Sequence, residues 1–187
     1  DSATMMNKIF EIIEAKKIFN IPYKKLSILV HPKSYIHAIV RFNNGMTKLI
    51  AHETSMEIPI LNSIYSNYDF KKNYYKNDLS LLNNLNFQKI DRRKFPVLNI
   101  LKKIPESSSL YETLIVSAND QLVELFLNNK IQFVDIYKKL SKLISLNEFS
   151  KYKKIKPKKI KDIILLDNYV RLKIKSNLKN LWSNIYW

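Results

Sequence analysis

The stretch that decides the local fold reads Asp1-Ser2-Ala3-Thr4-Met5-Met6-Asn7-Lys8-Ile9-Phe10-Glu11. A small polar segment here leads into a segment whose apolar side chains recur on one side of a helix as far as Ile13. Ser2 or Thr4 has a hydroxyl suited to capping such a helix. We therefore predict one amphipathic helix over residues 6–20, which ends before Pro22.

The same stretch predicts a phosphate site beside a carboxylate. Backbone N–H groups at a helix start, with Ser2, Asn7 and Lys8, supply hydrogen-bond donors for a phosphate. Glu11 follows Lys8 by three residues and Asn7 by four, so all three share one helix face. This arrangement suits a phosphorylated substrate held against a divalent metal. Without further context, a solvated ion pair at an ordinary capped helix start is the commoner explanation.

The stretch resembles the catalytic motif of the 1-deoxy-D-xylulose-5-phosphate reductoisomerase family, which ends Asn-Lys-Gly-Leu-Glu where this chain has residues 7–11. The similarity continues through 31–37 and 43–45 to Met56 and Pro59. It extends more weakly over 116–120, 125–127, 133–136 and 167–171. The resemblance implies an NADPH-dependent oxidoreductase and isomerase of non-mevalonate isoprenoid biosynthesis. Such an enzyme rearranges and reduces 1-deoxy-D-xylulose 5-phosphate to 2-C-methyl-D-erythritol 4-phosphate.

The resemblance also implies roles for individual residues. Glu11 corresponds to one of three carboxylates that bind Mg2+ or Mn2+ and counts, with Lys8, among the catalytic residues. Ser2, Asn7 and Lys8 look like the family's contacts to substrate phosphate and hydroxyl groups.

Two further residues are candidates by the same resemblance. His37 is placed near the substrate pocket as a catalytic residue, and Met56 on the side of the cofactor NADPH. A lone His between strands is also commonly structural, and a Met is commonly part of a core.

The chain departs from the family pattern in ways that bear on function. Ile9 replaces a Gly beside the catalytic Lys, and Thr54-Ser55 replace a Pro-Asp pair. With Gly45 as its one glycine, the chain has no glycine-rich nucleotide loop. We therefore expect a fragment that is inactive alone and requires an N-terminal NADPH-binding half, which would carry the other metal carboxylates. The family is homodimeric, and the hairpin around Gly45 is the candidate subunit contact.

The 187 residues carry a net charge of +16 and no cysteine. No run approaches the roughly 20 apolar residues that a membrane span needs, and no signal peptide is recognised. We expect a cytoplasmic bacterial protein that does not bind a membrane. The excess of Lys accompanies abundant Asn, Ile and Tyr, which is typical of an AT-rich genome. Nucleic acid is therefore not an expected partner.

One alternative function uses that charge. Residues 151–161 contain seven Lys and no acid. A non-catalytic basic module that keeps the fold could contact nucleic acid through this surface. Against it stand the lack of an accompanying Arg fork or aromatic platform and the intact set of Ser2, Asn7, Lys8 and Glu11.

The pattern along the chain predicts an α+β protein. Residues 1–64 are interpreted as the C-terminal part of a catalytic and dimerisation domain with a small sheet, 65–94 as a connecting region, and 95–187 as a helical bundle. The predicted strands are 26–30, 36–42 and 46–51, the last two joined by Asn43-Asn44-Gly45. The predicted helical segments begin at Met56, Pro96, Ser109, Phe133 and Pro157.

Overall fold

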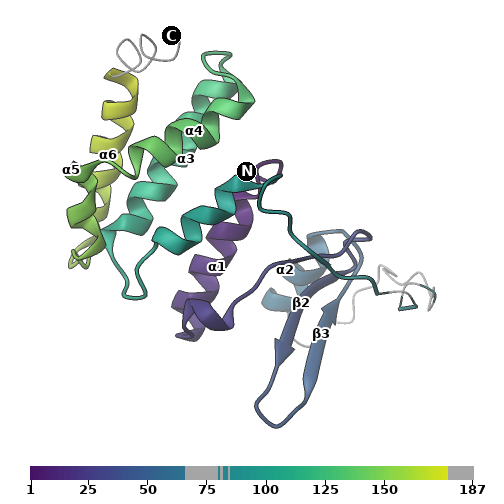
Figure 1. Ribbon diagram of the computed structural model, residues 1–187. Helices are drawn as coiled ribbons and strands as arrows, with labels where there is room; N and C mark the ends of the chain where they lie inside the picture. Colours follow the sequence, from purple (N-terminus) through teal and green to yellow (C-terminus); the bar gives the residue numbers. More distant parts are fainter. Residues whose placement is uncertain (66–79, 81, 84, 177–187) are drawn as a thin grey trace. The chain divides into compact units, whose positions relative to one another are not determined.

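The computed structural model describes residues 1–65, 80, 82–83 and 85–176, and it contains two compact units (Figure 1). The helical unit comprises residues 1–27 together with the chain from Asp91 onward, and the hairpin unit comprises Ile28–Ile90. The α+β class is confirmed. These units divide the chain at other points than the predicted domains, because the first helix joins the C-terminal helices. The domain division by sequence stays a prediction.

In the helical unit, the described residues form one long helix at the N-terminus and three in the C-terminal part. Its elements are α1 (Met6–Phe19), η1 (Tyr23–Lys25), η3 (Pro96–Lys103), α3 (Leu110–Leu127), α4 (Phe133–Leu143), α5 (Asn147–Ser150), η4 (Lys151–Lys153) and α6 (Ile160–Ser176). The predicted helices over 6–20 and from Phe133 to Ile144 are confirmed within a residue at each end. The helix predicted from Pro157 begins three residues later, and its predicted part beyond Ser176 lies outside the described residues.

The core of the helical unit explains why α1 belongs to it. One face of α1 is buried through Met6, Ile9, Ile12 and Ile13, and this helix packs on η3. α3 packs on both α4 and α6, and its Leu114 and Ile115 are fully buried. The burial of these apolar side chains is the main force that holds the helical unit together.

The start of α3 follows its sequence signature. Ser109 accepts a hydrogen bond from the Tyr111 amide at 3.3 Å, and Glu112 accepts one from the Ser109 amide at 3.3 Å. This is the predicted capping box. Glu112 is only 3 % exposed and also pairs with Lys17 of α1 at 2.8 Å.

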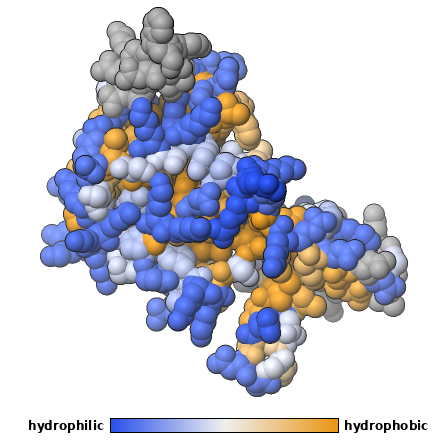
Figure 2. All heavy atoms as spheres, in the orientation of Figure 1, coloured by the Kyte–Doolittle hydropathy of each residue, from blue (hydrophilic) through white to orange (hydrophobic). Residues whose placement is uncertain are grey.

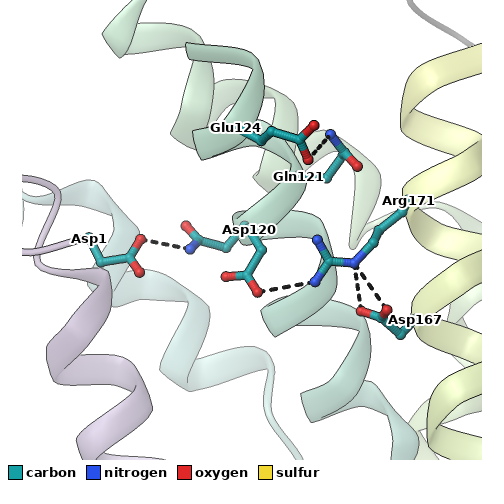
Figure 3. Close-up of polar contacts among 7 residues, drawn as sticks. Asp1, Asp120, Gln121, Glu124, Asp167 and Arg171 are labelled. Atoms are coloured by element: carbon teal, nitrogen blue, oxygen red, sulfur yellow. Dashed lines mark hydrogen bonds and ion pairs between the residues drawn. The ribbon is translucent and has the colours of Figure 1, made fainter. Parts of the chain in front are cut away.

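A charged cluster joins α3 to α6 (Figure 3). The Arg171 guanidinium lies 2.9 Å from Asp167 one turn earlier in α6 and 3.2 Å from Asp120 in α3. Partial burial alone would raise the pKa of Asp167. Hydrogen bonds from Ser117 and Arg171, with the charge of Arg171, outweigh it and hold this pKa below its ordinary value.

This cluster predicts a pH dependence of stability. Because the folded pKa of Asp167 lies below the unfolded value of about 3.9, its contribution is complete above that value. The contribution is lost as the pH falls through the folded pKa. Urea unfolding of the wild type is expected to show a loss of stability below about pH 4 that is smaller in Asp167→Asn. Equal pH slopes for the two proteins would contradict this assignment.

The described residues of the hairpin unit form two small antiparallel sheets and the helix α2. β2 (Ile36–Arg41) pairs with β3 (Thr47–Ala51), and β1 (Leu29–Val30) pairs with β4 (Gln88–Lys89). α2 (Glu57–Ile64) follows, with Pro59 in its first turn as predicted. The predicted hairpin over 36–51 is confirmed. The strand predicted over 26–30 is limited to two residues, and β4 lies in the stretch interpreted as a connection.

The hairpin turn depends on its glycine. Gly45 has a φ of +88°, and no atom within 4 Å would meet an added Cβ. The Gly45 amide donates to the Phe42 carbonyl at 3.1 Å, and the Met46 amide donates to Asn44 Oδ1 at 3.1 Å. Any effect of a side chain at this position is therefore backbone strain and not a clash.

Gly45→Ala is accordingly expected to destabilise the hairpin by about 1 kcal/mol. Gly45→Asn should cost less, because Asn adopts positive φ more readily than Ala. Amide hydrogen exchange of β2 and β3 measures both effects. Equal exchange in the Ala variant and the wild type would show that the turn bears no such strain.

Among the described helices, none combines the length and apolar character that a membrane crossing requires.

Candidate active site

α1 places three of the predicted site residues together on one face. Lys8 Nζ donates to both carboxylate oxygens of Glu11, at 3.0 and 2.8 Å, and Asn7 Nδ2 donates to Glu11 Oε1 at 3.4 Å. The Glu11 side chain is 54 % exposed and that of Lys8 38 %. An ion pair this exposed contributes little to stability, so both groups remain available to a ligand.

The turn before α1 is built differently from the prediction. Met5 is the N-cap residue and has a left-handed backbone, with a φ of 66°. The Met6 amide donates to Thr4 Oγ1 at 3.3 Å and to the Asp1 carbonyl at 3.0 Å. Thr4, and not Ser2, therefore supplies the hydroxyl at the helix start. Ser2 participates through its carbonyl, which accepts from the Met5 amide at 3.0 Å.

This turn changes which donors could bind a phosphate. The amides of Met5, Met6 and Lys8 already donate to carbonyls within residues 1–5. A phosphate at this position would therefore rely on side chains, chiefly the Lys8 ammonium. Ser2 is exposed at the surface of the same turn.

Asn7 carries an unused acceptor. Its Oδ1 is buried, and no described residue forms a hydrogen bond to it. A buried carbonyl oxygen without a donor is uncommon in folded proteins and is a plain candidate for a water or a ligand hydroxyl. The donor side of the same amide contacts Glu11.

Ile9 lies on the opposite side of the helix from this cluster. Its side chain is fully buried in the core of the helical unit, whereas Lys8 and Glu11 are exposed. The extra side chain at this position therefore adds to the packing of α1 and not to the candidate site.

His37 and Met56 belong to the hairpin unit. The His37 ring stacks on that of His52 with centroids 3.6 Å apart and an interplanar angle of 4°. His37 Nε2 lies 3.2 Å from the His52 carbonyl oxygen. Met56 precedes α2, and its side chain is 66 % exposed. An exposed Met is not a core residue, which leaves this side chain available for a contact.

The described residues fit one part of a divalent metal site. No three His, Cys, Asp or Glu side chains gather as a potential metal site anywhere in the described part of the chain. Within the Asn7–Lys8–Glu11 cluster, Glu11 is an exposed carboxylate, an oxygen ligand of the hard kind that Mg2+ and Mn2+ prefer. Since Mg2+ is commonly held by one or two carboxylates with water and substrate oxygens, Glu11 fits as a single protein ligand.

The Lys-rich stretch 151–161 is partly engaged within the helical unit. Lys151 lies over the ring of Tyr152 and Lys153 over that of Tyr111. The amides of Lys158 and Lys159 donate to Asp162 at 2.9 and 3.0 Å, which caps the start of α6. These contacts account for the stretch as an ordinary connection between helices.

Sequence reasoning missed two contacts near the predicted residues. The His52 ring stacks on His37, and Asn119 Nδ2 of α3 donates to Asp1 Oδ1 at 2.8 Å. Nothing in the pattern around His52 predicts stacking. Asn119, by contrast, lies in the segment 116–120, which resembles the family. That resemblance could have marked Asn119 as a residue of interest.

Comparisons with known proteins agree with the motif. Residues 52–173 match the family described as DXP reductoisomerase C-terminal domain. The 1-deoxy-D-xylulose 5-phosphate reductoisomerase of Pelagibacter ubique is 60% identical over 176 residues, which cover 94% of this chain and 45% of that protein. The enzyme of the same name from Persephonella marina is 35% identical, with 98% of this chain and 46% of that protein covered.

Solved structures show the same likeness. One is the reductoisomerase from Zymomonas mobilis in complex with NADPH, with a TM-score of 0.80 and 31% identity over 95% of this chain and 46% of that one. Another is a DOX-P reductoisomerase with fosmidomycin and magnesium. It has a TM-score of 0.85 and 26% identity, and the match covers 98% of this chain and 47% of that one.

The chain belongs to the DXP reductoisomerase family, in which its residues 52–173 correspond to the C-terminal domain. It spans about half the length of the curated relatives that it matches.

Proposed function

We propose that this chain is the C-terminal part of an enzyme that converts 1-deoxy-D-xylulose 5-phosphate to 2-C-methyl-D-erythritol 4-phosphate in the non-mevalonate pathway. The enzyme uses NADPH and Mg2+ or Mn2+ and works in the bacterial cytoplasm. The observation that carries the proposal is the grouping of Asn7, Lys8 and Glu11 on one exposed face of α1. Membership of the family is the reason to connect that grouping with a metal and a phosphorylated substrate.

Glu11 is the residue of this chain that holds the metal. A divalent cation held there would supply Lewis-acid polarisation of the carbonyl and hydroxyl oxygens of the substrate. Glu11 contributes one carboxylate, and Asn7 donates a hydrogen bond that fixes its Oε1. The two remaining metal carboxylates are assigned to the N-terminal half.

Lys8 has two successive partners in this proposal. In the structure its ammonium holds Glu11 in a bidentate ion pair. A cation held by Glu11 would weaken this pair and would leave the Lys8 ammonium free to contact the substrate phosphate. Ser2 and Asn7 add polar contacts to substrate oxygens.

The cofactor site is assigned mainly outside this chain. A single glycine cannot supply the glycine-rich loop that dinucleotide-binding folds use. We therefore assign NADPH binding to an N-terminal half, without which this chain does not turn over. By the family resemblance we assign Met56, which is exposed before α2, an apolar contact with the cofactor, and His37 a role toward the substrate.

The hairpin around Gly45 is the proposed contact between two subunits. Apolar side chains are exposed on both faces of the hairpin, Val40 and Ile50 on one and Leu49 on the other. Figure 2 shows hydrophobic surface in this part of the molecule. Exposed apolar patches of this kind commonly mark interfaces.

The test is NADPH consumption by the full-length gene product that carries this chain. With 1-deoxy-D-xylulose 5-phosphate and Mg2+ or Mn2+, we expect substrate-dependent loss of NADPH absorbance, abolished by a chelator and restored by added metal. A folded full-length protein without turnover under these conditions would refute the proposal. The comparisons do not favour the alternative of a basic nucleic-acid module.

A further inference from the structure

The turn that precedes α1 adopts a backbone that its sequence does not favour. Met5 has a φ of 66°, a left-handed conformation that residues with a side chain rarely adopt. Three of the hydrogen bonds that hold this turn run from Met5 N–H to the Ser2 carbonyl, and from Met6 N–H and Thr4 Oγ1–H to the Asp1 carbonyl. Two of the three end on Asp1. The position of Asp1 therefore governs the turn from which the site residues follow.

Asp1 is held by one side chain of α3. Asn119 Nδ2 donates to Asp1 Oδ1 at 2.8 Å, a contact across 118 positions of sequence (Figure 3). Asn119 is only 1 % exposed, and its neighbours Ala118 and Leu122 are 0 % and 2 % exposed. Such close packing restricts the movement of the Asn119 side chain, so its hydrogen bond holds the Asp1 carboxylate in place.

α3 is itself anchored next to this contact. Asp120, the following residue, pairs with Arg171 of α6, which in turn holds Asp167. The other end of α1 is tied to the same helix, because Lys17 pairs with the buried Glu112 at 2.8 Å. Glu112 and Asn119 are seven residues apart, about two helical turns. Lys8 and Glu11 thus lie in the chain between two residues that are bound to α3, Asp1 before α1 and Lys17 within it.

We propose that Asn119 is a positioning residue for the Glu11 site, which it serves by holding Asp1 and the strained turn at Met5. The inference rests on the function proposed above. A metal carboxylate must keep its place to a fraction of an ångström for efficient catalysis. Without the Asn119 contact the turn relaxes from its left-handed conformation, and Ser2, Lys8 and Glu11 shift together. We therefore expect kcat to fall by more than a smaller fraction of folded protein would explain.

The decisive experiment exchanges donor and acceptor in the full-length gene product. Asn119→Asp places two carboxylates at hydrogen-bond distance and is expected to lower kcat by about thirtyfold, with the KM for NADPH unchanged. The double variant Asp1→Asn with Asn119→Asp restores an amide opposite a carboxylate. It is expected to recover kcat to within about threefold of the wild type.

Gln121→Glu is the matched control. Gln121 is fully buried in the same helix, and its amide donates to Glu124 at 3.0 Å. Gln121→Glu replaces an amide by a carboxylate, as Asn119→Asp does, and the new carboxylate also lies opposite an acid. Unlike Asn119, however, Gln121 does not contact Asp1. The control substitution is expected to lower Tm while kcat stays within about threefold of the wild type.

A second measurement does not depend on catalysis. In Asn119→Ala, hydrogen exchange at the Met5 and Met6 amides should accelerate at least about tenfold, while Leu140 in the core of α4 keeps its rate. Faster exchange in a protein that shows no turnover would support the positioning role and refute only the proposed function. Unchanged exchange at Met5 and Met6, or a double variant no more active than Asn119→Asp in an active enzyme, would overturn the inference.

Discussion

Glu11→Gln in the full-length gene product is expected to lower kcat/KM about a thousandfold, equivalent to roughly 4 kcal/mol of transition-state stabilisation. The amide keeps the size and hydrogen-bonding shape of the carboxylate but removes the charge that binds a cation. Folding should be unaffected, because the pair with Lys8 is exposed and such pairs contribute about 1 kcal/mol at most. Steady-state NADPH consumption and thermal unfolding measure the two quantities separately.

Glu14→Gln is the control for that change. Glu14 is an exposed carboxylate on the same helix, three residues after Glu11. The substitution Glu14→Gln removes the same charge as Glu11→Gln but leaves the Asn7–Lys8–Glu11 cluster intact. We therefore expect kcat/KM to stay within about twofold of the wild type. Equal kinetics for the two variants would remove Glu11 from the catalytic site.

Lys8→Met is expected to have the second largest effect, and on a different parameter. A charge-assisted bond to a phosphate is worth roughly 2–3 kcal/mol, so the KM for the phosphorylated substrate should rise about fiftyfold. Inhibition by inorganic phosphate should weaken in parallel. The KM for NADPH should not change, because Lys8 has no assigned contact with the cofactor.

Lys24→Met provides the comparison for Lys8. Lys24 lies exposed in η1 of the same unit, so its loss lowers the net charge by the same amount. Any general electrostatic attraction of an anionic substrate to this basic protein is thereby measured separately. A KM that rises equally in both variants would mean that Lys8 has no specific contact with phosphate.

Much of the fold could be predicted because its strongest signals are local. The periodicity of α1, the Ser109–Glu112 capping box and the turn at Asn43-Asn44-Gly45 each depend on residues close in sequence. Local patterns of this kind decide whether a helix or a hairpin forms, and all three are present in the structure.

The features that were missed depend on distant partners. β4 has only two exposed residues, Gln88 and Lys89, and forms because β1 is available to pair with it. α1 joins the C-terminal helices through buried contacts with η3, which no local pattern reveals. The 3-10 geometry of η3 likewise differs from an ordinary helix only in its hydrogen bonding.

In the candidate site, too, the local arrangement was predictable and the tertiary contacts were not. Helical spacing was sufficient to place Lys8 and Glu11 on one face, because that face repeats every three to four residues. The left-handed Met5 and the bond from Asn119 to Asp1 were not predictable from spacing. They arise where a tertiary contact stabilises a backbone that the local sequence disfavours.

The most direct test of the central claim is binding of Mn2+ to the full-length gene product, followed by the electron paramagnetic resonance of free Mn2+. The wild type and Glu14→Gln are expected to bind one Mn2+ per chain, more tightly when the phosphorylated substrate is present. Glu11→Gln is expected to bind it at least about tenfold more weakly in both conditions. Equal Mn2+ affinity in Glu11→Gln and the wild type would contradict the assignment of Glu11 as a metal ligand.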